Sequence, residues 1–454
     1  MRSVYSIRMS VVPFFIFLVF ISFYVFFLFG CERNFLVELV FLVIMLHSVF
    51  FALFALRPLM QVYFSFSYVF FGLAPLVQYR NNVVFSGPNG IWESGWMLAG
   101  LVVVLCNFIM IYAYRYAIQR QIIYALCDAN CFRINETIVL RRYYKYRVAL
   151  LIFLSFVSCF VTFYFHSFSF MALLWRGGVA DGINFSSTVI LLSQPIQLLP
   201  FAGALLYKLY FPEKKAVFYV LFVCVLFCTF PTGVSRFQAA AIYISLLVAS
   251  FPSILMKARL PMMLIFGVLF LFPMMDVFRV YTDHFSFKAY GWFEEMESRN
   301  FDSFQSIVDV LDLGIITWGR QLVGVLLFFV PRNIWPEKPI GSGAFMAEVY
   351  GLSFTNVSAN YFAEGYINFG FLGLVLFAVI LGLVLGYLDS DAFKYGFAFK
   401  RIIFVYLIGY LFFLMRGDLM SSFSYLIAFV VPVYFVYRLI IESNGHLYLF
   451  PKNH

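Results

Sequence analysis

The stretch SIVDVLDLGIITWGRQLVGVLLFFV, residues 306–330, which continues into PRNIWPEKPIGSG, residues 331–343, decides the topology of the chain. Its first part is long and apolar enough to suggest a membrane span, yet it contains Asp309, Asp312 and Arg320. On insertion scales, one such charge at the centre of a span costs about 2.5–3.5 kcal/mol. We therefore predict helices that lie in the membrane interface or dip partway into it without crossing.

Whether this stretch crosses the membrane determines the side on which every later loop lies. An additional crossing would place Lys394, Lys400 and Arg401 outside, although lysine and arginine favour cytoplasmic loops. Without it, most of the 31 basic residues fall in cytoplasmic segments, most densely in the loop 115–147. We therefore predict that residues 331–343 lie on the outer face and that both termini are cytoplasmic.

The composition is typical of an all-α polytopic membrane protein. Of the 454 residues, 63% are hydrophobic and 12% are charged, whereas soluble domains contain about 25% charged residues. We predict one transmembrane domain over residues 1–454, an uncleaved first span, and one large periplasmic loop over residues 279–368. About twelve spans are expected, at residues 10–29, 35–56, 59–77, 93–114, 148–165, 188–207, 216–231, 238–254, 260–278, 369–388, 402–415 and 421–440.

The motifs that the sequence lacks narrow its function. It contains no glycine-rich nucleotide-binding loop, no HExxH zinc motif and no DxD-like acidic cluster on the predicted outer face, so we expect neither a metal nor a cofactor. The seven cysteines suggest no disulfide framework. The net charge of +9 reflects cytoplasmic loops and does not indicate nucleic acid. Acidic residues at mid-span are few, which disfavours an ion-coupled transporter.

The segment PRNIWPEKP allows two interpretations. Its prolines favour a stiff, extended backbone, and Trp335 is a side chain typical of the membrane–water boundary. Arg332 and Lys338 would then lie at headgroup depth, where a lipid-linked diphosphate presents its charge. The same residues would equally suit a helix stop with an aromatic anchor and two snorkelling cations.

Arginine is also common elsewhere on the predicted outer face, and its planar fork suits phosphate oxygens. Three arginines there are candidates for binding phosphate: Arg236 in FPTGVSRFQAA (230–240), Arg416 in FFLMRGDLMSSF (412–423) and Arg279 at the outer end of the ninth predicted span. Each also has a structural explanation, which is contact with lipid headgroups for Arg236, a pair with Asp418 for Arg416, and an i,i+3 pair with Asp276 for Arg279.

Two residues are candidates for proton transfer or for orienting an acceptor. Glu364 lies in YFAEGYINFG, among tyrosine and asparagine side chains that suit either a sugar site or an interface belt. His284 is the only histidine in the large loop, where a structural role is the simpler interpretation. The nearby run of Glu294, Glu295 and Glu297 is expected to mark a solvated helix face.

Several of these motifs together resemble the Wzy-type O-antigen polymerases, the oligosaccharide repeat-unit polymerases of bacterial inner membranes. The resemblance rests on FVPRNIWPEKP (329–339), on ANYFAEGYINFGFLGLVLF (359–377) and on the arginine turns TGVSRFQAA and MRGDLMSSF. It covers residues 230–425 by motif and the whole chain by its pattern of spans. Arg332 and Gly343 also match a spacing described for outer loops of some members, an arginine and a glycine separated by ten residues.

The resemblance implies a GT-C-like helical arrangement and a metal-independent, inverting-type glycosyltransferase that needs no cofactor. A hydroxyl of an incoming repeat unit would attack the anomeric carbon of the growing chain on the periplasmic face, and undecaprenyl diphosphate would leave. The product would be O-antigen or capsular polysaccharide. The implied partners are undecaprenyl-diphosphate-linked glycans, membrane lipids and a chain-length regulator of the polysaccharide co-polymerase type.

The resemblance also suggests roles for the candidate residues. The alternatives are an O-antigen ligase, which relies on an outer-loop histidine, and a non-enzymatic flippase or exporter of lipid-linked oligosaccharides. For the polymerase, the residues expected to bind the diphosphate are Arg236, Arg332 and Arg416, with Lys338 and Arg279 as helpers. Those expected to act as the base or to orient the acceptor are Glu364 and, less directly, His284.

Overall fold

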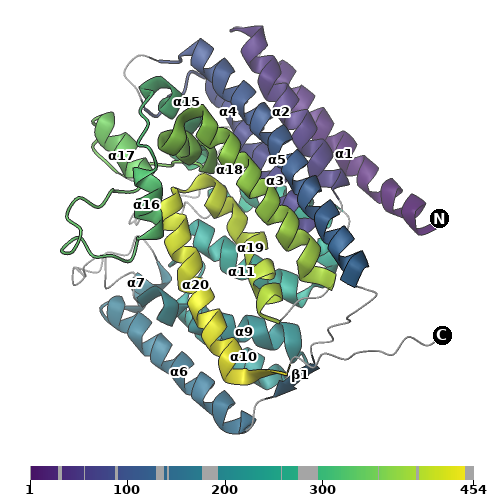
Figure 1. Ribbon diagram of the computed structural model, residues 1–454, viewed down its shortest axis with the longest axis vertical. Helices are drawn as coiled ribbons and strands as arrows, with labels where there is room; N and C mark the ends of the chain where they lie inside the picture. Colours follow the sequence, from purple (N-terminus) through teal and green to yellow (C-terminus); the bar gives the residue numbers. More distant parts are fainter. Residues whose placement is uncertain are drawn as a thin grey trace.

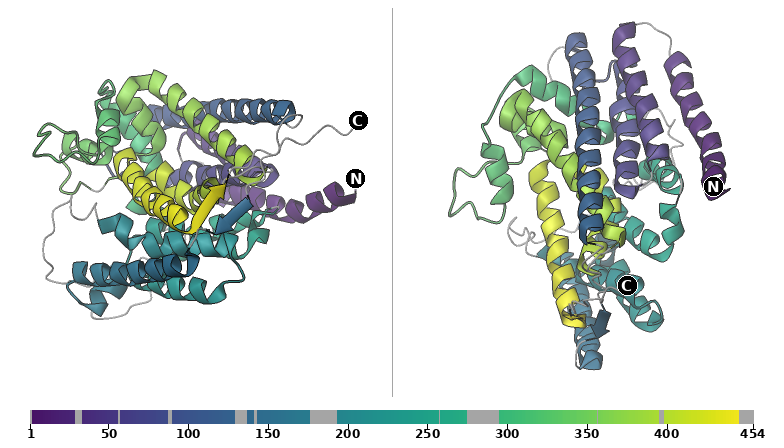
Figure 2. Two further views of the ribbon diagram at one scale, coloured as in Figure 1. Left: turned by 60° about the horizontal axis from the view of Figure 1, so that its bottom comes forward. Right: turned by 45° about the vertical axis from the view of Figure 1, so that its right-hand side comes forward.

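The computed structural model describes an elongated bundle of packed helices (Figures 1 and 2). Within the part of the chain that the structure describes, six helical segments are long and apolar enough to cross a membrane: Phe35–Phe54, Pro58–Arg80, Glu93–Arg120, Tyr144–Phe165, Tyr361–Asp389 and Leu419–Ile440. This confirms the prediction of an all-α membrane protein. The described residues are 2–28, 33–55, 57–86, 90–128, 137–140, 143–175, 193–256, 258–274, 295–355, 357–394 and 398–444.

The elements of the first half begin with α1 (Arg2–Leu28) and α2 (Phe35–Phe54). A continuous helical stretch follows, made of α3 (Pro58–Phe66), the π-helix η1 (Ser67–Leu73) and α4 (Ala74–Arg80). The next elements are α5 (Glu93–Asp128), β1 (Thr137–Leu140), α6 (Tyr144–Phe165), α7 (Phe170–Leu174), α9 (Leu199–Tyr210) and α10 (Lys215–Cys228).

The second half opens with α11 (Arg236–Ser250), the 3₁₀-helix η2 (Pro252–Leu255), and a stretch made of α12 (Arg259–Phe266), the π-helix η3 (Gly267–Leu271) and α13 (Phe272–Met274). The short helices that the structure describes after residue 294 are the 3₁₀-helix η5 (Arg299–Phe301), α15 (Ser303–Leu313), α16 (Arg320–Leu326) and α17 (Ser342–Val349). The chain closes with α18 (Tyr361–Lys394), α19 (Ala398–Arg416), α20 (Leu419–Ile440) and β2 (Ile441–Asn444).

The stretch from α3 to α4 forms the centre of the core, because none of its membrane-length window is exposed. It packs against α2, α12 and α19. Gly72 makes the close contact with α2 possible, since a Cβ at that position would lie 2.6 Å from Met45 Cγ. A small residue at such a point brings two backbones together, which is how membrane helices gain packing contacts.

The contact between α5 and α18 uses the same device. A Cβ on Gly382 would lie 2.4 Å from the carbonyl oxygen of Met110, and one on Gly386 would lie 2.7 Å from that of Tyr114. Neither helix could approach so closely with a larger side chain at these positions. This packing fixes α18, which carries Glu364 in its first turn.

A buried ion pair joins three of the first helices. Arg80, at the end of α4, lies 2.7 Å from the Glu38 carboxylate on α2, and the two side chains are only 3% and 0% exposed. Arg80 also donates to the backbone carbonyl of Val25, near the end of α1, at 2.6 Å. Glu38 is therefore the countercharge of an arginine that could not otherwise remain in this apolar setting.

The stretch that begins at residue 306 does not form one long helix. Its helices α15 and α16 contain 11 and 7 residues, whereas a crossing helix needs about 20. The charge of Asp309 is enclosed, and Ser86 Oγ donates to it at 2.5 Å. Asp312 lies 3.3 Å from the Tyr350 hydroxyl, which donates to it.

Helix α18 is broken near its beginning. Phe369 (φ −143°, ψ 19°) and Gly370 (φ 61°, ψ −145°) leave helical geometry, and Gly370 adopts a conformation that side chains rarely allow. The break exposes carbonyl groups of the first segment, and the loop before α16 satisfies them. Thr317 N donates to Ile367 O at 2.7 Å, and Gly319 N donates to Asn368 O at 3.0 Å.

The two ends of the bundle differ in construction. At one end, α15, α16 and α17 pack around the beginnings of α18 and α20 (Figure 1). At the opposite end of α20, β2 pairs antiparallel with β1, with Thr137 opposite Asn444. All of the sequence-predicted site residues that the structure describes belong to the first end.

Candidate functional site

Arg416 ends α19 and reaches across to η5. Its Nε donates to Asn300 O at 2.9 Å, and its Nη2 lies 3.2 Å from Asp302 Oδ1. The alternative in which Arg416 pairs with Asp418 is wrong, because Asp418 caps α20 instead. That carboxylate accepts hydrogen bonds from Ser421 N at 2.7 Å and from Ser421 Oγ at 3.0 Å.

Arg236 begins α11, directly after its N-cap residue Ser235. Its side chain turns inward, so that the residue is only 8% exposed. One guanidinium nitrogen lies 4.0 Å from Glu295 Oε1, and another donates to the side-chain oxygen of Asn300. The guanidinium also lies over the ring of Phe272, 4.1 Å from its centroid. Arg236 therefore faces the protein interior and not the lipid headgroups.

Residues 295–302, here called the acidic segment, connect the two arginines. Asn300 binds both, through its side chain to Arg236 and through its carbonyl to Arg416. Asn300 Nδ2 also donates to Glu295 Oε1 at 2.7 Å. Two guanidinium groups from α11 and α19 thus meet two carboxylates, Glu295 and Asp302, within one short segment.

The prediction of a solvated glutamate run is wrong for Glu295, which is only 5% exposed. The reason is that Arg236 supplies a countercharge and Asn300 supplies a hydrogen bond, so that the carboxylate is tolerated in an apolar setting. Glu297 does form an exposed contact, with Asn81. Glu294 lies outside the described residues.

Glu364 is completely enclosed, with 0% exposure. Both of its carboxylate oxygens accept hydrogen bonds, one from Ser342 Oγ at 2.8 Å and the other from Leu419 N at 2.7 Å. Asn360 fixes the start of α18, because its Oδ1 accepts from the backbone N–H groups of Phe362 and Ala363. Glu364 therefore ties α17 and the first residue of α20 to α18.

The turn between α19 and α20 also contacts the loop before α17. A Cβ on Gly341 would lie 3.0 Å from Asp418 Oδ2, so that a larger residue would require this carboxylate to shift. Burial raises the pKa of Asp418 above its usual range, while hydrogen bonds from the start of α20 oppose that rise. The turn is thus in contact with the acidic segment, with Glu364 and with the loop before α17.

Arg332 and Lys338 form a separate cluster in the proline-rich segment. Arg332 is exposed, and its Nη1 donates to Lys338 O at 2.8 Å. Lys338 Nζ donates to the carbonyl groups of Val330, at 3.0 Å, and of Phe328. Partial burial, and then the nearby charge of Arg332, lower the pKa of Lys338. Lys338 therefore stabilises the end of the apolar stretch.

The structure thus brings Arg236, Arg416 and Glu364 together around the α19–α20 turn and the acidic segment. Arg332 and Lys338 lie in the neighbouring cluster, and Arg279 and His284 lie outside the described residues. Sequence reasoning missed the partners Asn300, Asp302 and Ser342, because nothing in their local pattern marks them. Only the asparagine cap before α18 carries a recognisable local signal.

Two arginines that pair with two carboxylates can bind a small, highly charged anion if that anion displaces the carboxylates. Such a site needs no metal to gather positive charge. Within the described part of the chain, no three histidine, cysteine, aspartate or glutamate side chains are grouped as metal ligands would be.

Comparisons with known proteins add no relative to this picture. No protein-family model matches the chain, and no curated protein and no solved structure matches it significantly. The fold and the composition define the class, which is an all-α membrane protein. Any narrower identity depends on the motifs and on the site described above.

Proposed function

We propose that the protein polymerises undecaprenyl-diphosphate-linked oligosaccharide repeat units into O-antigen or capsular polysaccharide on the periplasmic face of a bacterial inner membrane. The observation that carries this proposal is the meeting of Arg236, Arg416 and Glu364 at one end of the bundle. These residues come from three separate motifs that resemble Wzy-type polymerases, and a shared site would explain why the motifs occur together. About twelve spans in a GT-C-like arrangement belong to the same proposal.

The proposed reaction joins two lipid-linked glycans. The oxygen of an acceptor hydroxyl forms a bond to the anomeric carbon of the growing chain, while the bond from that carbon to the diphosphate oxygen breaks. The electron pair leaves with undecaprenyl diphosphate, and the hydroxyl proton passes to a base. Because the glycosyl diphosphate bond supplies the free energy, no ATP site is needed.

The arginines would stabilise the charge that develops on the leaving diphosphate. A preorganised donor at such a position contributes about 10²–10³ in rate. In the structure Glu295 pairs with Arg236 and Asp302 pairs with Arg416. A diphosphate would therefore displace one or both carboxylates. Arg416 is the more accessible arginine, with its side chain 17% exposed, compared with 9% for Arg236. We therefore assign the first contact with the diphosphate to Arg416.

The remaining candidates have supporting roles in this proposal. Arg332 is exposed and can approach a second phosphate, whereas Lys338 supports the segment that carries Arg332. Arg279 and His284 remain predictions from the sequence, as does the chain-length regulator. Glu364 is better suited to positioning than to proton transfer, because both of its oxygens are already engaged and the side chain is enclosed.

A glutamine at position 364 separates these two roles. Glutamine keeps the shape of glutamate and can still accept from Leu419 N, so Glu364→Gln is expected to retain polymerisation within about tenfold if Glu364 positions the turn. Loss of a general base would instead reduce the rate by about 10²–10⁴. The measurement is the rate of chain extension in membranes, with Glu364→Ala as the variant that should fail in either case.

Deletion of the gene tests the function as a whole. The expected result is a surface polysaccharide reduced to single repeat units on lipid A, with long chains restored by the wild-type gene. Loss of every repeat unit from the surface would instead indicate the flippase. Long chains that remain lipid-linked and never reach lipid A would indicate the ligase.

A further inference from the structure

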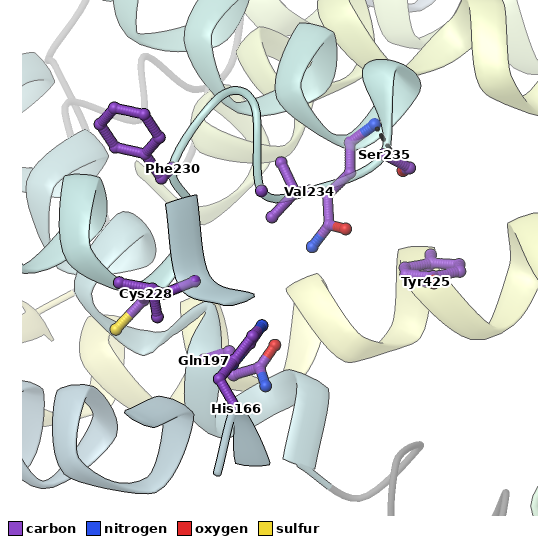
Figure 3. Close-up of a pocket in the computed structure, with 10 residues that line it drawn as sticks. His166, Gln197, Cys228, Phe230, Val234, Ser235 and Tyr425 are labelled. Atoms are coloured by element: carbon purple, nitrogen blue, oxygen red, sulfur yellow. Dashed lines mark hydrogen bonds between the residues drawn. The ribbon is translucent and has the colours of Figure 1, made fainter. Parts of the chain in front are cut away.

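A cavity of about 200 Å³ lies next to the first turn of α11, outside the arginine site described above (Figure 3). Its walls come from parts of the chain that are far apart in sequence: the end of α6, the stretch before α9, the α10–α11 turn, and α20. Side chains that define its chemistry are His166, Gln197, Phe230, Ser235, Gln238 and Tyr425.

The cavity offers hydrogen-bonding groups that no described side chain or backbone group uses. The amide groups of Gln197 and Gln238 form no side-chain hydrogen bond with any residue that the structure describes. His166 Nδ1 lies 2.8 Å from Thr162 O, so in the neutral ring this nitrogen donates and Nε2 is left as an acceptor. In Figure 3 the side chains of His166 and Gln197 both point into the cavity.

This lining selects against two classes of ligand. Among the described residues that line the cavity there is no lysine, arginine, aspartate or glutamate, so this lining supplies no countercharge for a charged ligand. An acyl chain is equally unsuitable, because leaving an amide unpaired against hydrocarbon costs about 1–3 kcal/mol. The lining suits an uncharged molecule with several hydroxyl groups.

Size and shape restrict the ligand further. Pockets for drug-sized ligands occupy about 300–1,000 Å³, so the smaller volume here suits one sugar ring and not a longer oligosaccharide. Phe230 and Tyr425 add aromatic surface to the cavity, and the C–H face of a pyranose packs against such surfaces. Amides and an imidazole on the other sides match the hydroxyl groups at its rim.

The position of the cavity connects it to the arginine site. Ser235 and Gln238 line the cavity, while Arg236, between them on the same turn, directs its guanidinium to Glu295 and Asn300. In a lipid-linked glycan, the first sugar is bonded directly to the diphosphate. One helical turn thus presents neutral groups on one side and a cation on the other, in the order that such a substrate requires.

We propose that this cavity binds one uncharged sugar ring of the lipid-linked substrate, the ring adjacent to the diphosphate. The assignment to that substrate rests on the proposed polymerase function, whereas binding of a neutral sugar rests on the lining alone. Gln197, Gln238 and His166 bind the hydroxyl groups, and Arg236 marks the side on which the diphosphate lies.

Saturation-transfer NMR can test the site with the full-length protein in lipid nanodiscs. The probes are free methyl glycosides of neutral hexoses, deoxyhexoses and N-acetylhexosamines. At least one is expected to receive saturation from the wild-type protein. Gln197→Leu and Gln238→Leu should each weaken its binding about 3- to 10-fold, as expected for one lost hydrogen bond. Gln194→Leu is the matched control, because Gln194 lies three residues before Gln197 and does not line the cavity.

A second kind of variant, which fills the cavity, tests the site independently of the glutamine substitutions. Val234→Phe narrows the cavity from its loop side without removing a polar group, and it is expected to abolish the same signal. Each variant must elute from size exclusion as the wild-type protein does. If no glycoside receives saturation, or if saturation survives in the folded cavity variants, the sugar site is wrong.

The outcomes distinguish this inference from the proposed function. One possible result is that glycoside binding depends on Gln197 while deletion of the gene leaves the length of the polysaccharide chains unchanged. That result would support the sugar site and refute the polymerase. Single repeat units after deletion, together with cavity variants that polymerise and bind normally, would support the polymerase and refute the sugar site.

Discussion

In cells that produce Arg416→Ala in place of the wild-type protein, long polysaccharide chains are expected to disappear. The rate of chain extension should fall by about 10²–10³, because the leaving diphosphate loses a preorganised cation. The rate of chain extension with Arg416→Lys should lie between those of the wild-type protein and Arg416→Ala, since lysine keeps the charge but lacks the planar fork that binds two oxygens at once. The measurement is the repeat-length ladder of surface polysaccharide at matched protein levels.

The ion pair that Arg416 forms provides a control for structure. Arg416→Ala removes the contact with Asp302, which lies 3.2 Å away, so a defect could reflect a loosened acidic segment. Asp302→Asn breaks the same ion pair but leaves the arginine in place and free of its competitor. We expect Asp302→Asn to retain polymerisation. Full-length chains from Arg416→Ala, or an equal loss in both variants, would contradict the diphosphate role of Arg416.

The second large effect is expected far from the site, at Glu38. Glu38→Ala should reduce the free energy of unfolding by about 3–5 kcal/mol, because it leaves Arg80 buried without its countercharge. Both side chains are almost entirely enclosed, so solvent cannot replace the lost partner. The measurement is reversible unfolding of the purified protein in mixed micelles, followed by the loss of helical circular dichroism.

A double variant tests the cause of that loss. Arg80→Met in the Glu38→Ala background removes the orphaned charge, and part of the stability should return as a coupling free energy. Recovery should be incomplete, because Arg80 also donates to Val25 O at the end of α1. Additive effects of the two substitutions would show that the ion pair does not account for the loss.

The sequence predicted the class of the protein well, because hydrophobic composition and run length report directly on the solvent that surrounds a helix. Asp309, Asp312 and Arg320 also gave the correct indication that residues 306–330 do not form one long helix. The sequence could not show how those charges are enclosed. Ser86, which contacts Asp309, is 223 residues away from it in the chain.

The candidate site was predictable only in part. Arg236, Arg416 and Glu364 stand out locally, as an arginine in a short turn or an acid near a helix start. Their partners do not, since Asn300 resembles any polar residue of a loop and lies 116 residues from Arg416. Glu295 shows the limit most clearly, because a run of glutamates looks the same in sequence whether it faces water or an arginine.

The break in α18 has a consequence for biosynthesis. A buried carbonyl group that is left unpaired costs about 1–3 kcal/mol, and those of the buried residues Ile367 and Asn368 are paired by Thr317 and Gly319, which precede α18 in the chain. The partners are therefore synthesised before the helix that needs them. During membrane integration, α18 can reach its final shape only after the loop at residues 314–319 has docked beside it, so an insertion in that loop should arrest assembly of the protein.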